Sequence, residues 1–407
     1  MSGPGHRPPL TAPTTDAPPA STEITVVGGG LFGAACAYWL ASSGRRVSVV
    51  EAGSLAGGAT GSGAGLVVPA TPEPYERAAE RLGPRTARQV LRIAEKGFTL
   101  LRKATEHGEV DCPVNTDGHI QLAVGEERTA ALATRARALR SDGVATEWLS
   151  PRDLRGAINT QIAPDVRCGL LLPGGSLDPT LLVLALLKAA MDLGATVHTG
   201  TAVIDVKQAT KGVRVMTTRG LVRSDAAIVA VNAWSGRLVP DLDRVITASQ
   251  AQVLATEVLP AVFTTGMSAT VGANGTYWQQ TRDGRVILGG YGPSVSTRAG
   301  SSGPLDRKPE DAVHAALTRA LPRLFPAIGQ FRATQRRAAP IARTADRLPV
   351  VHRVDESVWA ASGFDLNGLP LAMALSRALA IAVPSGWAPA ELGPFALCRP
   401  SLRPATV

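Results

Sequence analysis

Three glycines near the start of the chain have the spacing of a phosphate-binding turn. Gly28, Gly30 and Gly33 form the pattern G-x-G-x-x-G directly after the β-branched run from Ile24 to Val27. Glycine at these positions permits a tight turn and a close approach of the backbone to a pyrophosphate, and the N-terminus of the helix that follows attracts the phosphates. Glu51, 18 residues after Gly33, is placed to accept hydrogen bonds from ribose hydroxyls and would repel a 2′-phosphate. The motif therefore predicts a site for NAD or FAD and argues against NADP.

The elements that would position this turn form a βαβ unit. Residues 24–27 have the pattern of a buried parallel strand, residues 31–42 that of a helix ending at Gly44, and residues 47–51 that of a second strand. Further along, Asp283-Gly284 marks a hairpin turn. We expect further helices over residues 75–107 with a break near Gly83-Pro84, 126–140, 178–193 and 369–383, and strands over 118–124, 196–198, 203–206, 213–217, 226–231, 246–256, 276–290 and 358–361.

A loop of small residues follows the second strand. Residues 52–66 read AGSLAGGATGSGAGL, which is too long and too rich in glycine for a plain connection between two elements. Such a loop can wrap closely around an extended cofactor.

The order and spacing of several segments together resemble the flavoprotein family of D-amino acid oxidase, glycine oxidase and sarcosine oxidase. The resemblance covers roughly residues 24–384. It is carried by the following segments, in chain order: VVGGGLFGAACAYWLASSG, Glu51, GGATGSGAGLVVP, LDPTLLVLALLKAAMDLGATV, IVAVNAWSGRL, YWQQTRDGRVILGG, TADRLPV and ASGFDLNG.

By this resemblance the fold would be α/β, with a Rossmann-type FAD-binding domain interleaved with a smaller α+β substrate domain that carries an antiparallel sheet. The FAD-binding domain would comprise residues 24–100, 160–245 and 336–390, and the substrate domain residues 101–159 and 246–335. Residues 1–23, which contain six prolines, would form a disordered tail, and residues 391–407 a second flexible tail.

The resemblance also implies which residues contact FAD. Asn232 stands where the family usually has glycine, and so does Arg347 in the segment that matches the pattern T-x-D-G-x-P. A sarcosine-oxidase-like cysteine for covalent flavin attachment is replaced by the run from Ala338 to Pro340, so the FAD should be noncovalent. The expected cofactor-binding residues are Gly28, Gly30, Leu31, Phe32, Gly33, Glu51, Ala52, Thr60, Gly61, Gly65, Leu66, Val203, Asn232, Trp234, Asp346, Gly363, Leu366, Asn367, Gly368 and Leu369.

The implied reaction is oxidation of an amino acid or a secondary amine, including N-substituted glycines, by hydride transfer to flavin N5. The imine would hydrolyse to a 2-oxo acid or glyoxylate, and O2 would become H2O2. The helix that starts after Gly368 would stabilise the charge that develops on the flavin. The candidate catalytic residues are Arg343, a fork for a substrate carboxylate, Tyr277 and Gln279 on one face of a strand with Trp278 on the other, and Asp365, which would recognise a cationic amine or cap the following helix.

The family's usual carboxylate anchors are missing from the chain. The positions of the basic residues fall at Ile341, Leu366 and Pro370. Either Arg343, or Arg336 and Arg337 beside it, has taken over this role, or the substrate is held in another way.

Composition and charge leave two alternatives to an oxidase. The chain has 42 Lys and Arg against 33 Asp and Glu, a formal net charge of +9, so a non-enzymatic nucleic-acid-binding protein is one, although its Arg-rich helices lack interleaved aromatic residues. The other is a dehydrogenase that passes electrons to a quinone or a partner subunit. The four cysteines are far apart, which favours a reducing, cytoplasmic setting and argues against a zinc site. We expect a small-molecule amine substrate, O2 as acceptor, no metal, no nucleic acid and no membrane span.

Overall fold

The first of two large sheets is mainly parallel. The computed structural model describes residues 17–271, 274–290, 296–298, 308–366 and 368–402. Within these residues the first sheet has the strand order β18-β19-β11-β1-β2-β8, and all neighbours except β18 and β19 run parallel. The bounds are β1 (Ser21–Val27), β2 (Val47–Val50), β8 (Thr196–His198), β11 (Gly220–Val229), β18 (Val350–Arg353) and β19 (Val358–Ser362).

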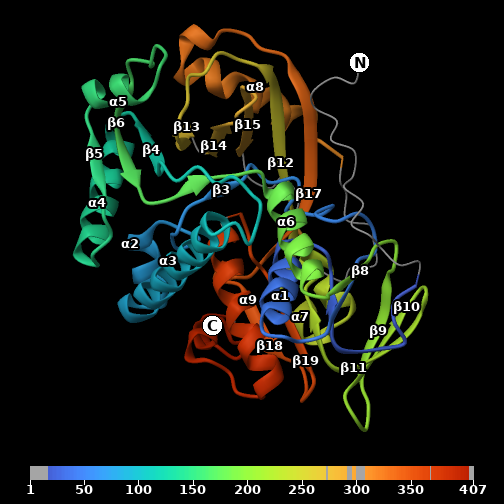
Figure 1. The fold of residues 1–407 in the computed structure, drawn as a ribbon. Coiled ribbons are helices and arrows are strands. Elements are labelled where there is room, and N and C mark those ends of the chain that lie inside the picture. The colour runs from blue at the N-terminus through green and yellow to red at the C-terminus, as the bar shows by residue number, and fades with distance from the viewer. Residues whose placement is uncertain (1–16, 272–273, 291–295, 299–307, 367, 403–407) are drawn as a thin grey trace, which may run out of the picture.

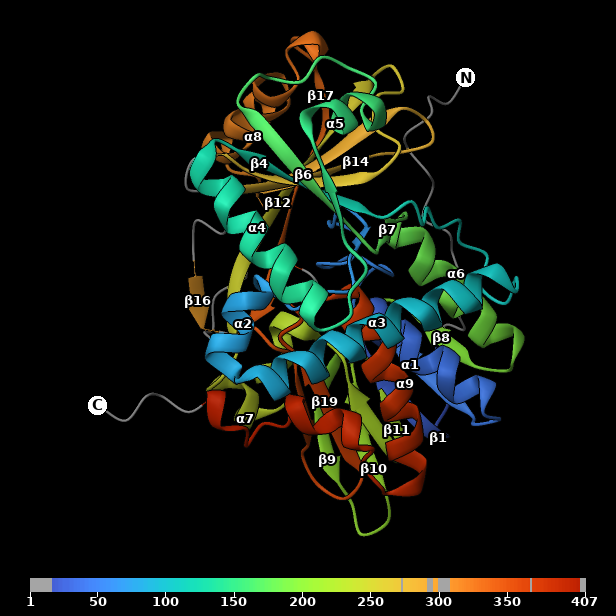
Figure 2. The same cartoon turned by 90° about the vertical axis from the view of Figure 1, so that its left-hand side faces the viewer.

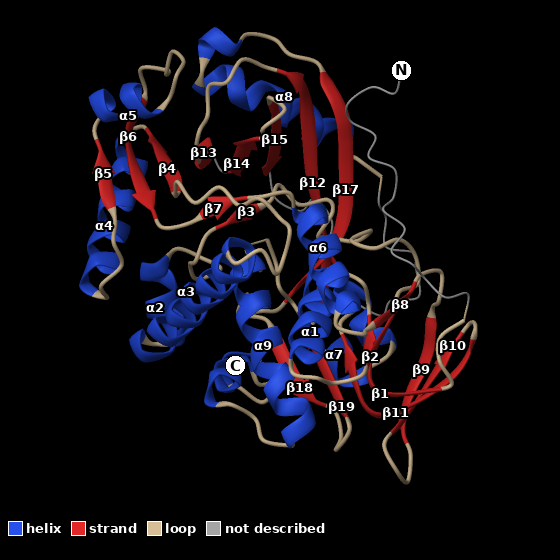
Figure 3. Cartoon of the chain, viewed as in Figure 1, coloured by secondary structure: helices blue, strands red, loops and turns tan. Residues whose placement is uncertain are grey.

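Both faces of this sheet are covered, as a parallel sheet requires. On one face lie α1 (Leu31–Ser42), α3 (Pro84–Glu106), α6 (Pro179–Asp192) and α9 (Leu369–Ser385), whose apolar side chains share one core with β1 and β2. The hairpin of β9 (Val203–Gln208) and β10 (Val213–Thr217) extends this sheet through the antiparallel pairing of β10 with β11, and its apolar side chains share a core on the other face with α7 (Pro240–Asp243). Figure 3 shows this hairpin projecting from the edge of the molecule. In α3, a Cβ at Gly97 would lie 1.8 Å from the Pro370 carbonyl oxygen, so the α3–α9 crossing needs glycine there.

The second sheet is mainly antiparallel and lies above the first (Figures 1 and 2). Its order is β16-β12-β15-β14-β13-β4-β6-β5, with β17 also paired to β12. Trp278 packs with Phe263 and Phe325 on the face covered by α8 (Asp311–Leu324). The bounds are β4 (His119–Val124), β5 (Glu147–Leu149), β6 (Val166–Leu172), β12 (Thr247–Val258), β13 (Gly266–Val271), β14 (Asn274–Gln280), β15 (Arg285–Gly290), β16 (Ser296–Arg298) and β17 (Ala333–Arg343).

Smaller elements connect the two sheets. The strands β3 (Leu66–Val67) and β7 (Gly175–Ser176) form a two-stranded ribbon. The helices α2 (Tyr75–Leu82) and α4 (Glu126–Ser141) contact each other beside β4, and α5 (Pro151–Ala157) packs on β6. The 3-10 helices are η1 (Asn232–Arg237), η2 (Pro326–Ile328), η3 (Ala390–Phe395) and η4 (Pro400–Leu402). No helix among the described residues is both long and apolar enough to span a membrane.

The expected α/β class, the βαβ start and the helix break near Gly83-Pro84 are confirmed. The hairpin turn is also where it was expected: β14 and β15 flank it, and Gly284 has φ +85°. Trp278 and Tyr277 point to opposite faces of β14, as the alternation predicts, because Trp278 is in the core and Tyr277 faces a cavity.

Several expected boundaries differ from the structure. β6 pairs with β4 and β5, so residues 166–172 extend the second sheet although we assigned them to the FAD-binding segment. β17 pairs with β12 as far as Arg343, well past the expected boundary at residue 336. The reason is that strand pairing depends on the partner strand, which local composition does not reveal.

The chain ends also differ from the expectation. β1 begins at Ser21, inside the expected N-terminal tail, and residues 1–16 lie outside the described part. Residues 391–402 of the expected flexible tail are packed against the body of the protein: Leu392 and Phe395 are buried in the core of α3 and α9, and Arg399 is 7% exposed. The proline-rich composition of this segment is typical of a flexible tail, but Leu392, Phe395 and Arg399 have specific partners in the fold.

Candidate cofactor and substrate site

A cavity of about 890 Å³ lies between the two sheets. One part is lined by the β1–α1 turn, Glu51, the loop of small residues and η1, and the other by residues of β4, β13 and β14 in the second sheet. A single cavity therefore joins the predicted dinucleotide motif to the face of a second domain.

The glycines of the motif have distinct roles. Gly28 has φ +113°, and a Cβ there would lie 2.6 Å from the Ala230 carbonyl oxygen. A Cβ at Gly33 would lie 1.9 Å from the Gly28 carbonyl oxygen, so glycine lets α1 approach β1 closely. Gly30 is the N-cap of α1 and supplies no side-chain hydrogen bond, while the Leu31 N–H donates to Thr60 Oγ1 at 3.3 Å. This helix end meets the cavity with its positive dipole end, which suits a phosphate.

Glu51 is held in place by the backbone. Its Oε2 accepts a hydrogen bond from Gly29 N at 2.7 Å and its Oε1 one from Gly53 N at 2.8 Å. The carboxylate lines the cavity, so it is fixed where a ribose hydroxyl donor would meet it.

Two side chains of the second sheet hold the loop of small residues. Gln279 Nε2 donates to the Ala64 carbonyl and, at 2.9 Å, to the Leu177 carbonyl. Arg337 Nη1 donates to the Gly61 carbonyl at 2.9 Å, and burial lowers the pKa of this arginine. Gln279 therefore links the two domains and does not line the cavity.

Asn232 has a left-handed backbone conformation. Its φ is +46°, a region that asparagine tolerates better than most residues. It lines the cavity, and its buried Oδ1 has no hydrogen-bond partner among the described residues. An unsatisfied buried acceptor at this point fits a polar ligand.

Most of the expected cofactor-binding residues come together around the cavity. Gly33, Gly61, Asp346 and Gly363 do not line it, and Asn367 lies outside the described residues. Those that do line it are Gly28, Gly30, Leu31, Phe32, Glu51, Ala52, Thr60, Gly65, Leu66, Val203, Asn232, Trp234, Leu366, Gly368 and Leu369.

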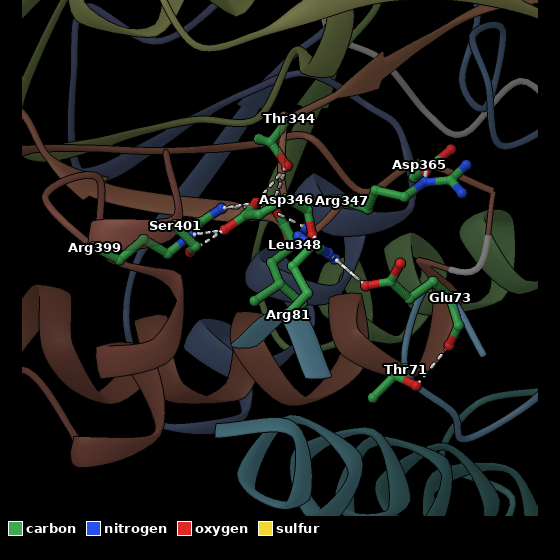
Figure 4. Close-up of polar contacts among 10 residues, drawn as sticks. All are labelled: Thr71, Glu73, Arg81, Thr344, Asp346, Arg347, Leu348, Asp365, Arg399 and Ser401. Carbon is green, nitrogen blue, oxygen red and sulfur yellow. Dashed lines mark hydrogen bonds and ion pairs between the residues drawn. The ribbon is translucent and has the colours of Figure 1, made fainter. Parts of the chain in front are cut away.

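Asp346 belongs to a buried ionic network and has no access to the cavity. Its carboxylate accepts from Arg399 Nε at 2.6 Å and Nη2 at 2.8 Å, and from Ser401 and Thr344. Burial by itself would raise the pKa of Asp346, but these hydrogen bonds, led by those from Arg399, hold it below its ordinary value. Figure 4 shows the Asp346 carboxylate facing Arg399 and Ser401. The side chain thus has a structural role, and a contact between this residue and FAD stays a prediction.

Of the candidate catalytic residues, Tyr277 and Asp365 line the cavity and Arg343 does not. Asp365 accepts hydrogen bonds from Arg343 Nε at 2.7 Å and from Arg347 Nε at 3.0 Å, and its carboxylate is 3% exposed. Arg343 is therefore already paired with a carboxylate of the protein. Arg336 is ion-paired with Asp311 at 2.6 Å and does not line the cavity.

Sequence reasoning found Tyr277 but missed the polar side chains that lie beside it on the second sheet. Gln121 of β4 pairs in register with Ser268 of β13, and Ser268 with Tyr277 of β14, and all three line the cavity. His119 lies two residues before Gln121 on the same strand, and the His119 Nε2 is 2.9 Å from Ser268 Oγ. His119 and Gln121 alternate with apolar residues in the predicted strand 118–124, a signal that could have identified them.

Burial sets the protonation of this row. It raises the pKa of Tyr277 to about 12, with a further rise from Asp365 that Arg343 opposes, and it lowers the pKa of His119 to about 4. At neutral pH the row therefore presents a protonated phenol and an uncharged imidazole.

The residues present fit FAD. The N-terminus of α1 has no side-chain cap and suits a phosphate. The oriented Glu51 carboxylate suits a ribose hydroxyl, and the Asn232 Oδ1, which has no partner among the described residues, suits a polar group of the cofactor. None of the four cysteines, all of which lie in the described part of the chain, lines the cavity.

Comparison with known proteins agrees with this assignment. The family model of FAD-dependent oxidoreductases known as DAO matches residues 23–381. The chain is 25% identical to glycine oxidase of Geobacillus kaustophilus over 385 residues, covering 93% of this chain and 97% of that protein. It is also 25% identical to gamma-glutamylputrescine oxidoreductase of Escherichia coli over 370 residues, covering 88% and 82%.

Solved structures show the same fold. The crystal structure of glycine oxidase from Geobacillus kaustophilus superposes with a TM-score of 0.79 at 23% identity, covering 94% of this chain and 99% of that one. That of L-proline dehydrogenase from P. horikoshii gives 0.77 at 19% identity, covering 93% and 98%. With a family match that covers most of its length, the chain belongs to the DAO family of FAD-dependent oxidoreductases.

Proposed function

We propose that the enzyme oxidises an amine or amino acid at the carbon next to nitrogen and uses O2 as the final electron acceptor. The observation that carries the proposal is that one cavity is lined both by the dinucleotide motif and by the polar row Gln121, Ser268 and Tyr277. The substrate loses a hydride equivalent and becomes an imine, which water hydrolyses to a 2-oxo acid, to glyoxylate from an N-substituted glycine, or to another carbonyl compound. When bound, FAD supplies the hydride acceptor at N5 and the route by which two electrons reach O2 as H2O2.

The side chains around the cavity position the substrate and favour its reactive form. An amine releases hydride only when its nitrogen lone pair is free, and neighbouring positive charge lowers the pKa of an ammonium group. Arg343 and Arg347 face one carboxylate, Asp365, so this cluster carries a net positive charge. The Tyr277 hydroxyl, protonated at neutral pH, can donate a hydrogen bond to the substrate without adding negative charge.

The relatives support an amine substrate of this kind. Two of them are named for amines, gamma-glutamylputrescine in Escherichia coli and 4-methylaminobutanoate in Paenarthrobacter nicotinovorans. The second is the longer protein, and the match spans 45% of it. Glycine oxidase is named for the simplest α-amino acid.

The test is anaerobic reduction of the purified holoenzyme. D- and L-amino acids, sarcosine and N-alkylated ω-amino acids are mixed with it one at a time while the flavin absorbance is followed, and air is then admitted. We expect bleaching by at least one amine, rapid recovery in air and stoichiometric H2O2. Recovery only with a dye or a quinone would make the enzyme a dehydrogenase, and no bleaching by any amine would refute the proposed substrate class.

A further inference from the structure

The two arginines that contact Asp365 do not line the cavity. Ile341 and Leu366, two of the positions where relatives of this type would carry a basic anchor, line it with apolar side chains. Arg343 and Arg347 both donate to Asp365, and neither lines the cavity. A carboxylate attached directly to the reacting carbon would therefore meet Ile341 and Leu366 and not the guanidinium of Arg343 or Arg347.

The opposite part of the cavity does contain an arginine. Arg135 of α4 lines it together with Leu139 of the same helix, Tyr75 of α2 and Gln121 of β4. The Arg135 side chain is only 20% exposed. It comes from an Arg-rich helix in which Arg137 and Arg140 are exposed.

The contacts of Arg135 leave part of its guanidinium available. Nε and Nη2 each lie 3.4 Å from a Glu76 oxygen, and Nη1 donates to Gln121 Oε1 at 2.8 Å. A guanidinium has five N–H donors, so two have no partner among the described residues. Glu76 and Gln121 hold the group in one orientation, and the remaining donors suit a carboxylate.

The polar row connects the two ends of the cavity. Gln121, Ser268 and Tyr277 stand opposite one another on the adjacent strands β4, β13 and β14. Since neighbouring strands lie about 4.8 Å apart, the row spans roughly 10 Å. This is the length of an extended chain of several carbons.

We propose that the substrate is an amine whose carboxylate lies several carbons away from the reacting carbon, and that Arg135 binds that carboxylate. The inference rests on the proposed amine oxidation and names its substrate class. The reacting end lies by Tyr277 and Asp365, the chain follows the polar row, and the carboxylate meets Arg135. A substrate with a remote ammonium group is the competing class, because Glu73 also lines the cavity and uses only its Oε1 to accept from Arg81 Nε at 2.7 Å.

The test is a substrate series with the wild-type holoenzyme. N-methylglycine, 3-(methylamino)propanoate, 4-(methylamino)butanoate, 5-(methylamino)pentanoate, N-methylbutylamine and 1,4-diaminobutane are compared by the rate of anaerobic flavin reduction. We expect kcat/KM to be at least tenfold higher for the best remote carboxylate than for N-methylglycine or for either compound without a carboxylate.

Variants then identify the anchor. Arg135→Gln should lower kcat/KM for the remote carboxylate at least tenfold, mainly through KM, and leave N-methylbutylamine unchanged; Arg135→Lys should restore part of the loss. Arg137→Gln, on the exposed side of the same helix, is the control. Binding of glutarate, followed through the flavin spectrum, should weaken in Arg135→Gln and not in the control, which gives a readout independent of turnover.

The outcomes separate the two proposals. If no amine reduces the flavin, the proposed function fails and the inference with it. If amines are oxidised but N-methylglycine or 1,4-diaminobutane is the best substrate, the function stands and the inference is overturned. The same holds if Arg135→Gln and Arg137→Gln behave alike. The wild-type series decides the substrate class even if Arg135→Gln does not fold.

Discussion

Asp365 and Arg347 are joined by an ion pair of 3.0 Å between Oδ2 and Nε, and both have positive φ, +49° and +61°. Arg347 stands where the T-x-D-G-x-P pattern has glycine. Each left-handed backbone costs on the order of 1 kcal/mol or more for a residue with a Cβ. The ion pair, with Arg343 as its third member, holds together two loops that would otherwise relax.

Substitutions at Asp365 and Arg347 distinguish the contribution of the ion pair to stability from that of the positive φ angles. Asp365→Asn keeps a side chain that tolerates this φ but leaves Arg343 without its carboxylate, so we expect a loss of about 1–3 kcal/mol in the free energy of unfolding, measured in urea. Arg347→Gly relieves its strained φ and loses a contact that is 39% exposed on the arginine side, so its stability should be unchanged or higher. Arg347→Ala should be about 1 kcal/mol less stable than Arg347→Gly. Equal stabilities of these two variants would contradict the argument from φ.

The Asp346–Arg399 pair should contribute more than any surface pair. Both side chains are nearly fully buried, at 0% and 6% exposed. Arg399→Ala leaves a buried carboxylate unpaired and should cost about 3–5 kcal/mol by chemical denaturation. Arg332→Ala is the matched control, since its contact with Glu257 is 3.8 Å long and the arginine is 77% exposed, and it should cost less than about 1 kcal/mol. Similar losses in the two variants would mean that the network around Asp346 is not energetically important.

Buried His119 predicts a particular dependence of stability on pH. Its pKa is about 4 in the folded protein and 6.5 as a free side chain, so between these values the unfolded chain binds a proton that the folded chain does not. Stability is therefore complete above pH 6.5 and falls as the pH drops towards 4, by roughly 3 kcal/mol at most from this group. Unfolding curves between pH 4 and 7.5 should show a shallower decline for His119→Asn. His107→Asn, at an exposed histidine, should retain the wild-type slope, and a His119 variant with that slope would refute the assignment.

Gln279 should control cofactor retention through the loop it holds. In Gln279→Glu the shape is kept, but a carboxylate cannot donate to the Ala64 and Leu177 carbonyls. We expect FAD to bind at least tenfold more weakly, measured by the fluorescence of flavin released on dilution. Gln208→Glu, on the exposed strand β9, should retain FAD as the wild type does. Unchanged retention in Gln279→Glu would show that the loop does not need this link.

How far the sequence could predict the site depends on how local each interaction is. Gly28, Gly30 and Gly33 act through the backbone within one βαβ unit, and the Glu51 carboxylate binds backbone N–H groups of the same unit, so local spacing was enough to bring them together. The buried pairing of Asp346 could not be predicted, because its partner, Arg399, lies 53 residues away in a segment with no motif.

Predicting the residues at the substrate end of the cavity required even more knowledge of the tertiary fold. Tyr277 was selected by strand alternation, and His119 and Gln121 carried the same signal in β4. Arg135 had no such signal, because it is one of many arginines in its helix and only the packing of α4 against β4 brings it to the cavity. Motifs therefore predicted most residues that line the cofactor part of the cavity, and long-range packing decided which residues line the rest.

The pairing of Asp346 with Arg399 also constrains the order of events during protein synthesis. A ribosome makes Asp346 53 residues before its partner, so while the growing chain emerges this carboxylate has no cation to accompany it into the interior. The loop from Thr344 to Leu348 can gain the contacts with Arg399 only after that residue has been translated. Nascent chains that stall before Arg399 should thus remain open at this corner and accessible to proteases that remove incomplete polypeptides.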